Sequence, residues 1–433
     1  MNRNTFIKDL LAGLTVSFAA LALGAAFGTM SGRGAFAGMI GAAIIPIFTS
    51  LLGGTRLQAS GPTGPMTAIT AILVAKAYDF FPQKELAEQF ITLTILMSGL
   101  FMIIAGILQL GKLIKYVPNC IVIGFMNGIA VLIWWDQIMK LFGIGGKKIM
   151  EGSISINLIL SLFILTLIFL IPVIVRKLAI PVKIRSYFSA VLISIVLGTV
   201  ISNILGFNIE KVKLGTTFNS FYEFTDILKA YFPSIDILKK EYLLLALPFA
   251  LQLMLLGYLD SLLTSLVVDK MVGEKTKVNK ELFAQGLANG ISAMLQGIPG
   301  AQATIRSVLL IKEQAQTRLA GVLIGVFVLI WILFFKNMIS LIPTAVFTGV
   351  LFKAGWDVLD REYFEVYFVK KWKDNFVRNF QMSLVLYTTL ITVLLDLNIA
   401  VFTGTAIYYL FKKFYKKQVI FDIESEYADE MEG

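Results

Sequence analysis

Histidine is absent from the 433-residue chain, and cysteine occurs only once, at Cys120. Without histidine the chain lacks the side chain that most often relays protons near neutral pH and binds transition metals. A single cysteine excludes an intramolecular disulfide and a thiolate metal cluster. We therefore expect any metal ion bound here to be a hard cation with oxygen ligands, and we expect no covalent cofactor.

Charged residues are also scarce, because they make up 15% of the chain while hydrophobic residues make up 57%. A soluble domain usually carries about a quarter charged residues. Apolar runs of about 20 residues, which suffice to cross a bilayer, recur along the whole sequence. No ATP-binding glycine loop, nucleophile elbow or metalloprotease motif is present, so we expect no enzyme activity. The composition predicts an all-α polytopic membrane protein, without a secretory signal peptide.

The apolar runs predict fourteen membrane segments in two sets of seven, separated by the polar stretch Gly206–Glu241. Seven is an odd number, so the second set is inverted relative to the first, and the pattern favours a 7+7 inverted repeat. The repeats span about 10–205 and 242–415, and 206–241 is expected to be an extracytoplasmic connection. The predicted segments are about 10–30, 34–53, 59–77, 89–110, 117–143, 154–175, 185–205, 242–268, 281–297, 298–311, 318–340, 342–356, 377–396 and 397–415.

The formal net charge of +10 would suggest nucleic-acid binding in a soluble protein. Here the charges lie in short loops between segments, so attraction to anionic lipid headgroups and the positive-inside bias explain them. Placing both termini in the cytoplasm leaves about two Lys or Arg inside for each one outside. We predict a multi-pass protein of the inner (plasma) membrane with cytoplasmic termini, in contact with lipid and not with nucleic acid.

The third segment of each set is short and interrupted by proline and glycine, at Ser60–Met66 (SGPTGPM) and Gly297–Thr304 (GIPGAQAT). Pro62, Pro65 and Pro299 each remove a backbone donor. An unpaired backbone group in hydrocarbon costs several kcal/mol, so such breaks persist only within protein or beside a wet cavity. Single kinks are common, but a matched pair of interrupted segments indicates the central site of a transporter.

Two half-helices that begin at these breaks would direct their N-terminal amides into one small volume. Each helix N-terminus carries about half a positive charge, so the pair is suited to a small anion. Further hydrogen-bond donors can come from the hydroxyls of Ser60, Thr63, Thr67 and Thr304.

Two ionisable side chains lie inside apolar runs, Asp260 and Arg306. A carboxylate at mid-membrane costs about 2.5–3.5 kcal/mol, so Asp260 is a candidate for function. Thr264 follows on the same helix face, and the two could help to form an oxygen cage for Na⁺. Asp260 could instead carry a proton or brace a helix pair. Arg306 either faces the cavity as a fixed positive charge for an anion or reaches to the interface as an anchor.

Four stretches of the chain resemble the SulP/SLC26 anion transporter family over nearly the whole length. The most specific is Gly53–Met66 (GGTRLQASGPTGPM), with its glycine-proline string. The others are Ala12–Thr15 (AGLT), Asp260–Thr264 (DSLLT) together with Lys280–Asn289 (KELFAQGLAN), and Arg318–Gly321 (RLAG).

This resemblance implies a UraA-like fold with core and gate domains, half-helix segments three and ten, an elevator mechanism and a homodimer. The sodium–bicarbonate symporter branch looks closest. It implies a Na⁺ site formed by Asp260, Thr264, Gln302, Ala303 and Thr304, and an anion site at Ser60, Thr63, Thr67, Ala303, Thr304 and Arg306. Proton-coupled relatives tend to carry Glu in place of Asp260.

Three features depart from the family pattern. Gln302 stands where the bicarbonate branch has a small residue, which preserves a backbone ligand but changes the cavity. The first segment, at Ala19–Gly24, lacks the usual proline, which affects the choice of substrate. The transporter domain is expected to cover 1–417, followed by a short acidic cytoplasmic tail at 418–433 in place of a STAS domain.

The sequence supports three hypotheses for function. The first is Na⁺-coupled symport of a small inorganic anion, with bicarbonate favoured over sulfate or chloride. The second is a proton-coupled sulfate or dicarboxylate transporter in which Asp260 carries the proton. The third is an uncoupled anion channel or exchanger, or a membrane scaffold that does not transport. A scaffold needs no matched helix breaks, and a channel needs no Na⁺ cage.

Overall fold

A computed structural model describes residues 3–144, 149–177, 190–211, 221–334, 341–369, 376–395 and 397–414. Within these ranges the chain is almost entirely helical and contains one pair of two-residue strands. It forms two compact units. The first unit comprises Met1–Ile114 and Ala130–Leu359, and the second comprises Lys115–Ile129 and Asp360–Gly433.

The first unit holds most of the helices. They are α1 (Arg3–Met30), α2 (Ala35–Leu52), α3 (Gly64–Phe80), α4 (Lys84–Ile107), α6 (Ile154–Lys177), α8 (Ala190–Ile204), α9 (Phe221–Tyr231), α10 (Lys240–Val272), α11 (Val278–Met294), α12 (Thr304–Lys312), α13 (Arg318–Phe334) and α15 (Thr344–Val358), with the 3-10 turn η2 (Ile235–Leu238). The second unit holds α16 (Arg361–Val369), α17 (Phe376–Leu394) and α18 (Leu397–Phe414). The residues of the 3-10 helix η1 (Leu110–Tyr116) and of α5 (Asn119–Phe142) are divided between the two units.

Each predicted segment coincides with one helix, and their bounds differ by a few residues. The start of the seventh segment, at 185–189, the end of the eleventh, at 335–340, the last residues of the thirteenth and fourteenth, 396 and 415, and the tail at 418–433 lie outside the described residues. The stretch 206–241, which the sequence predicts to be a polar connection, contains the helix α9 and the 3-10 turn η2. The polar composition of this stretch did not predict these two elements. Six helices in the described part of the chain are long and apolar enough to cross a membrane: α1, α2, α4, α5, α6 and α10. The count of fourteen crossings and the inverted repeat stay predictions.

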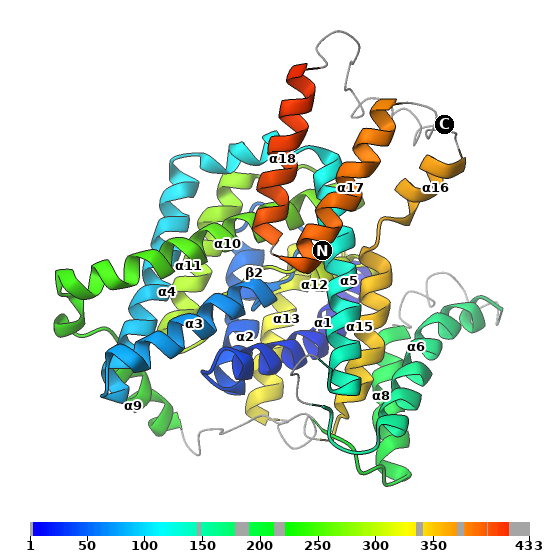
Figure 1. The fold of residues 1–433 in the computed structure, drawn as a ribbon. Helices are drawn as coiled ribbons and strands as arrows, with labels where there is room; N and C mark the ends of the chain where they lie inside the picture. Colours follow the sequence, from blue (N-terminus) through cyan, green and yellow to red (C-terminus); the bar gives the residue numbers. More distant parts are fainter. Residues whose placement is uncertain are drawn as a thin grey trace. The chain divides into compact units, whose positions relative to one another are not determined.

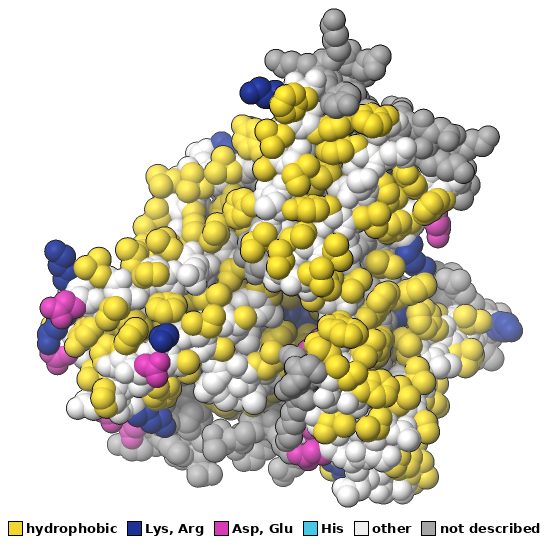
Figure 2. Space-filling model, in the orientation of Figure 1, with side chains coloured by type: hydrophobic (Ala, Val, Ile, Leu, Met, Phe, Trp, Pro, Cys, Tyr) yellow, Lys and Arg dark blue, Asp and Glu magenta, His cyan; other side chains and the backbone are white. Residues whose placement is uncertain are grey.

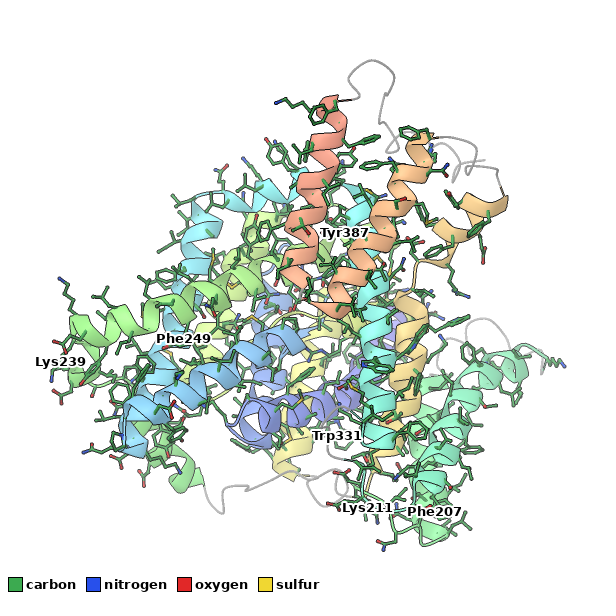
Figure 3. The ribbon with its side chains drawn as sticks, in the orientation of Figure 1. Phe207, Lys211, Lys239, Phe249, Trp331 and Tyr387 are labelled. Carbon is green, nitrogen blue, oxygen red and sulfur yellow. The ribbon has the colours of Figure 1, made fainter. Side chains whose placement is uncertain are left out.

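Most helices of the first unit pack in three groups (Figure 1). The helices α1, α2 and α13 pack against one another, α4 packs on both α10 and α11, and α15 packs on α6, which also contacts α8. Trp331 of α13 donates a 3.0 Å hydrogen bond to the Ser17 hydroxyl of α1, and its ring lies 4.8 Å from that of Phe18 (Figure 3). The visible face is mainly hydrophobic, and most of the charged side chains lie at its margins (Figure 2). This distribution fits a surface in contact with lipid.

Small residues allow α1 and α2 to approach closely. A Cβ atom added at Gly38 would lie 1.8 Å from the carbonyl oxygen of Gly24 and 2.6 Å from the amide nitrogen of Gly28. Both neighbours are backbone atoms, so they cannot move without a shift of a whole helix. Close helix packing through small residues is the usual way in which membrane helices associate.

The Gly38→Ala variant is therefore expected to destabilise the protein by about 1–3 kcal/mol, because the added methyl group overpacks the contact between α1 and α2. The thermal midpoint of the detergent-solubilised protein should fall accordingly. Gly290→Ala is the matched control, because a Cβ atom added there would meet only the Leu96 side chain, at 3.9 Å. Thermal unfolding of the two variants beside the wild type measures the difference. Equal midpoints for the two variants would contradict the proposed packing constraint.

The second unit is held together by aromatic and hydroxyl contacts. The rings of Phe380 and Phe411 stack with their centroids 3.6 Å apart and join α17 to α18. Tyr387 donates to the Thr403 hydroxyl at 3.0 Å (Figure 3). Thr389 donates to the carbonyl oxygen of Gly124, at the beginning of α5, at 3.1 Å.

Candidate ion-binding site

The two broken segments meet directly as an antiparallel pair of strands. Strand β1 (Ser60–Gly61) pairs with β2 (Ala301–Gln302), with Ser60 opposite Gln302 and Gly61 opposite Ala301. The amide of Ala303 extends the ladder by donating to the carbonyl oxygen of Ala59 at 3.1 Å. Part of the backbone released by the proline breaks is therefore satisfied across the two segments, as a low-dielectric interior requires.

Glycine is required where the two strands lie against each other. Gly61 has a φ of 140°, a conformation that residues with a side chain rarely adopt. A Cβ atom added at Gly300 would lie 2.1 Å from the carbonyl carbon of Gly61. The side chain of Asn289, on α11, holds Gly300 in place: its amide nitrogen donates to the carbonyl oxygen of Gly300 at 2.8 Å, and its oxygen accepts from the Gly300 amide at 2.7 Å.

Each strand leads into the N-terminus of a helix. Helix α3 begins at Gly64, after Thr63, and α12 begins at Thr304, after Ala303. Neither of the preceding residues makes a side-chain capping bond. The amides of Gly64 and Met66 in α3, where Pro65 has none, and the amides at the start of α12 therefore have no side-chain cap at the positive ends of these helices. Helix α10 packs against α3, β2 and α12, which brings a long apolar helix alongside both N-termini.

Asp260 of α10 and Arg306 of α12 form the charged centre of the site. Their residues are only 5% and 1% exposed, and the two opposite charges lie close enough to attract each other although no direct ion pair joins them. Arg306 Nη2 donates to the carbonyl oxygen of Pro62 at 2.9 Å, and Thr63 lies beside Asp260. Among the described residues, Arg306 Nε and Nη1 and Asp260 Oδ2 have no hydrogen-bond partner. This places Arg306 inside the protein and not at the membrane interface.

Four hydroxyl groups lie at the same junction. Thr264 Oγ1 is 2.6 Å from Thr304 Oγ1, which joins two residues of the predicted Na⁺ site. The hydroxyls of Thr63 and Thr67, both buried, have no partner among the described residues. A buried polar group without a partner costs about 1–3 kcal/mol, so this concentration of such groups suits a site that ions occupy.

Two predicted residues make side-chain hydrogen bonds outside this centre. The Ser60 hydroxyl donates to Gln58 Oε1 at 3.0 Å and accepts from Gln285 Nε2 at 2.7 Å, so it is engaged on the side of α11. The Gln302 side-chain oxygen accepts from the Thr55 hydroxyl at 3.4 Å, whereas its Nε2 atom is buried and has no hydrogen-bond partner among the described residues. The Gln302 backbone amide donates to Ser261 Oγ at 3.2 Å. Ala303 can offer an ion only its backbone groups.

The sequence pattern did not predict Glu281 as part of the site. It is fully buried on α11, and its carboxylate accepts hydrogen bonds from the loop that leads into β1. Gln58, in the loop before β1, and Gln285 and Asn289, inside α11, were not predicted either, because a single polar amide forms no recognisable pattern in one sequence. An acidic residue that opens an otherwise apolar segment was the available signal.

Comparisons with known proteins identify the family of the chain. The model of the sulfate permease family matches residues 6–377, and the chain belongs to this family of membrane anion transporters. It is 30% identical to YvdB of Bacillus subtilis, named provisionally as a sulfate transporter, over 95% of this chain and 74% of that one. It is 32% identical to the bicarbonate transporter BicA of Synechocystis, over 92% of this chain and 68% of that one.

A solved structure of the transmembrane domain of a cyanobacterial bicarbonate transporter BicA has a similar fold, with a TM-score of 0.63 and 28% identity. The match covers 93% of this chain and 98% of that chain. The predicted family is therefore confirmed, and the chain is a multi-pass membrane protein with a helical fold of this type.

Proposed function

We propose that this protein is a Na⁺-coupled symporter of a small inorganic anion, with bicarbonate as the favoured substrate. The observation that supports it is the pair of buried, partly unpartnered opposite charges at Asp260 and Arg306, set at two helix N-termini. Arg306 and the first-turn amides of α3 and α12 suit an anion, whereas Asp260 with the hydroxyls of Thr264 and Thr304 suits a hard monovalent cation.

Charge balance gives a physical reason for coupling the two ions. Bringing an anion alone into this site would place it near the Asp260 carboxylate in a low-dielectric interior, where like charges repel strongly. A cation bound at Asp260 removes that repulsion, so each ion improves the binding of the other. Such mutual stabilisation is reciprocal by thermodynamic necessity.

The arrangement of the whole chain belongs to the same proposal. We infer fourteen membrane segments in a 7+7 inverted repeat, a plasma-membrane location with both termini in the cytoplasm, and a homodimer. Transport would follow an elevator movement in which the helices around the site carry the ions. The likeness of the fold to the transmembrane domain of BicA supports this arrangement.

Uptake by the purified protein in proteoliposomes tests the function. Labelled bicarbonate should accumulate when an inward Na⁺ gradient is imposed, and a K⁺ gradient of the same size should not support accumulation. Uptake at equal rates with Na⁺ and K⁺ would contradict coupling.

A second candidate is proton-coupled transport of sulfate or a dicarboxylate. The unpartnered Oδ2 atom of Asp260 favours it, because a protonated carboxyl could serve the same role as a bound cation. An imposed pH gradient in the same vesicles separates the two: accumulation of labelled sulfate driven by protons without Na⁺ would select this alternative.

A further inference from the structure

A second buried carboxylate, Glu281 of α11, lies outside the centre formed by Asp260 and Arg306. Its residue is 0% exposed, and the hydrogen bonds that the described residues make to its carboxylate all come from N–H donors. The amides of Gly54 and Thr55 donate to Oε2 at 2.8 and 2.9 Å, and Gln58 Nε2 donates to the same atom at 3.0 Å. Gln285 Nε2 donates to Oε1 at 2.9 Å. A carboxylate surrounded by donors holds them firmly, because each bond to a charged acceptor is about twice as strong as a neutral one.

Two branches lead from Glu281 to the two strands of the ion site. In the first branch, Gln58 and Gln285 both bind Glu281 and both bind the Ser60 hydroxyl, at the first residue of β1. In the second branch, Thr55 binds Glu281 through its amide and Gln302 of β2 through its hydroxyl.

The two branches end at one rung of the strand ladder, because Ser60 and Gln302 are opposite each other. Residues directly opposite in an antiparallel pair present their side chains on the same face. Glu281 is therefore linked to the side chains on that face of the ladder. The residues that follow this rung, Gly61 and Ala303, lead toward α3 and α12. A shift of this rung would move both helix N-termini.

We propose that Glu281 is a positioning residue that fixes the register of β1 on β2 and thereby the ion-binding geometry of both helix N-termini; this rests on the ion site proposed above. A binding site keeps its affinity only when its supporting residues hold it within about 0.5 Å. Loss of the Glu281 charge should therefore weaken both ions together, although Glu281 touches neither.

The test is ion binding to the purified full-length protein, measured as the rise in thermal midpoint during titration with bicarbonate or sulfate in Na⁺, and with Na⁺ at a fixed anion concentration. For Glu281→Gln, the half-saturating concentrations of both ions should rise at least tenfold, because an amide has one acceptor oxygen in place of two and carries no charge. Its NH₂ group must face either the donors on Oε2, from Gly54, Thr55 and Gln58, or the Gln285 donor on Oε1. Glu281→Asp, which keeps the charge on a shorter stem, should recover part of that loss.

Glu88→Gln is the matched control for a buried carboxylate with only a structural role. Glu88 of α4 pairs with Arg33 at 2.6 Å and accepts from Tyr78 at 2.7 Å, and none of its hydrogen bonds within the described part of the chain reaches β1 or β2. This variant should lower the midpoint of the ion-free protein and leave the half-saturating concentrations within twofold of wild type. Unchanged half-saturating concentrations in Glu281→Gln would overturn the proposal.

If Glu281→Gln does not fold, Gln58→Ala and Gln285→Ala each remove one link to Ser60 and should each raise the half-saturating concentrations about threefold; wild-type values in both would equally overturn it. The readout is binding, so a wild-type protein that binds ions without transporting them would refute the proposed symport and leave this test intact. A wild type without any ion-dependent rise in midpoint would overturn both.

Discussion

The Asp260→Asn variant should lose the dependence of anion uptake on Na⁺, with a fall in apparent Na⁺ affinity of at least about 100-fold, or 2.7 kcal/mol. The amide keeps the shape of the side chain but removes the acidic group that we assign to the cation together with Thr264 and Thr304. The variant also leaves Arg306 as a buried cation without a counter-charge, which costs about 3–5 kcal/mol of stability. The anion can supply that counter-charge. Bicarbonate should therefore raise the thermal midpoint of this variant more than that of the wild type, without a need for Na⁺.

The control for Asp260→Asn is Asp136→Asn on α5. Asp136 pairs with Lys140 one turn along the same helix, and its side chain is 31% exposed. An exposed pair of this kind contributes about 0–1 kcal/mol, so Na⁺-dependent uptake should be unchanged. Retained Na⁺ dependence in Asp260→Asn vesicles would remove Asp260 from the cation site.

The second large effect is expected for Arg306→Gln, which should lower anion affinity by about 100-fold or more, because it removes a buried positive charge from the site. Helix N-terminal amides alone provide only partial charge. Na⁺ affinity should rise, since the Asp260 carboxylate loses its only charged neighbour at the centre. Isothermal titration with Na⁺ and with the anion measures both changes on one sample. The opposite directions for the two ions distinguish a role in the site from general destabilisation.

The charge-neutral double variant Asp260→Asn, Arg306→Gln provides the control. Both single variants leave one buried charge unpaired, whereas the double variant leaves none, and replacement of a complete buried pair is often close to neutral for stability. Its thermal midpoint should exceed that of either single variant, while transport of both ions is lost. A double variant that is less stable than both single variants would show that Asp260 and Arg306 do not form a pair.

The long helices could be predicted because each one is an apolar run of nearly membrane thickness, whereas the short helix α9 has no such run. Their bounds depend on where side chains leave the apolar region, and the sequence places these within a few residues. The pairing of β1 with β2 could not be predicted, because two-residue strands have no periodicity and their partners lie far apart in the chain. Proline and glycine at Pro62 and Gly300 indicated an interruption but not what replaces the helix.

The candidate site followed from the sequence to the extent that its residues were charged groups in apolar runs. Asp260 and Arg306 stand out against their neighbours, and the structure brings them together. The orientations of Ser60 and Gln302 could not be predicted, because the alternation of a strand decides which face each side chain occupies. The role of Glu281 could not be predicted, because its partners are backbone amides and glutamines, and no sequence pattern connects these to a carboxylate.

The short ladder between β1 and β2 has a consequence for how the protein is made. Ser60 and Gln302 are about 240 residues apart, and contacts between such distant parts of a chain form late because the intervening loop must first be closed. While the ribosome is still making the second half, the backbone at Ser60–Pro62 has no partner strand. Its unpaired N–H and C=O groups make its transfer into the hydrocarbon core unfavourable. This segment would therefore wait beside the insertion machinery or in the aqueous interface. A truncated chain that ends before Ala301 should be recognised as incomplete and degraded, even though its first helices are already in the bilayer.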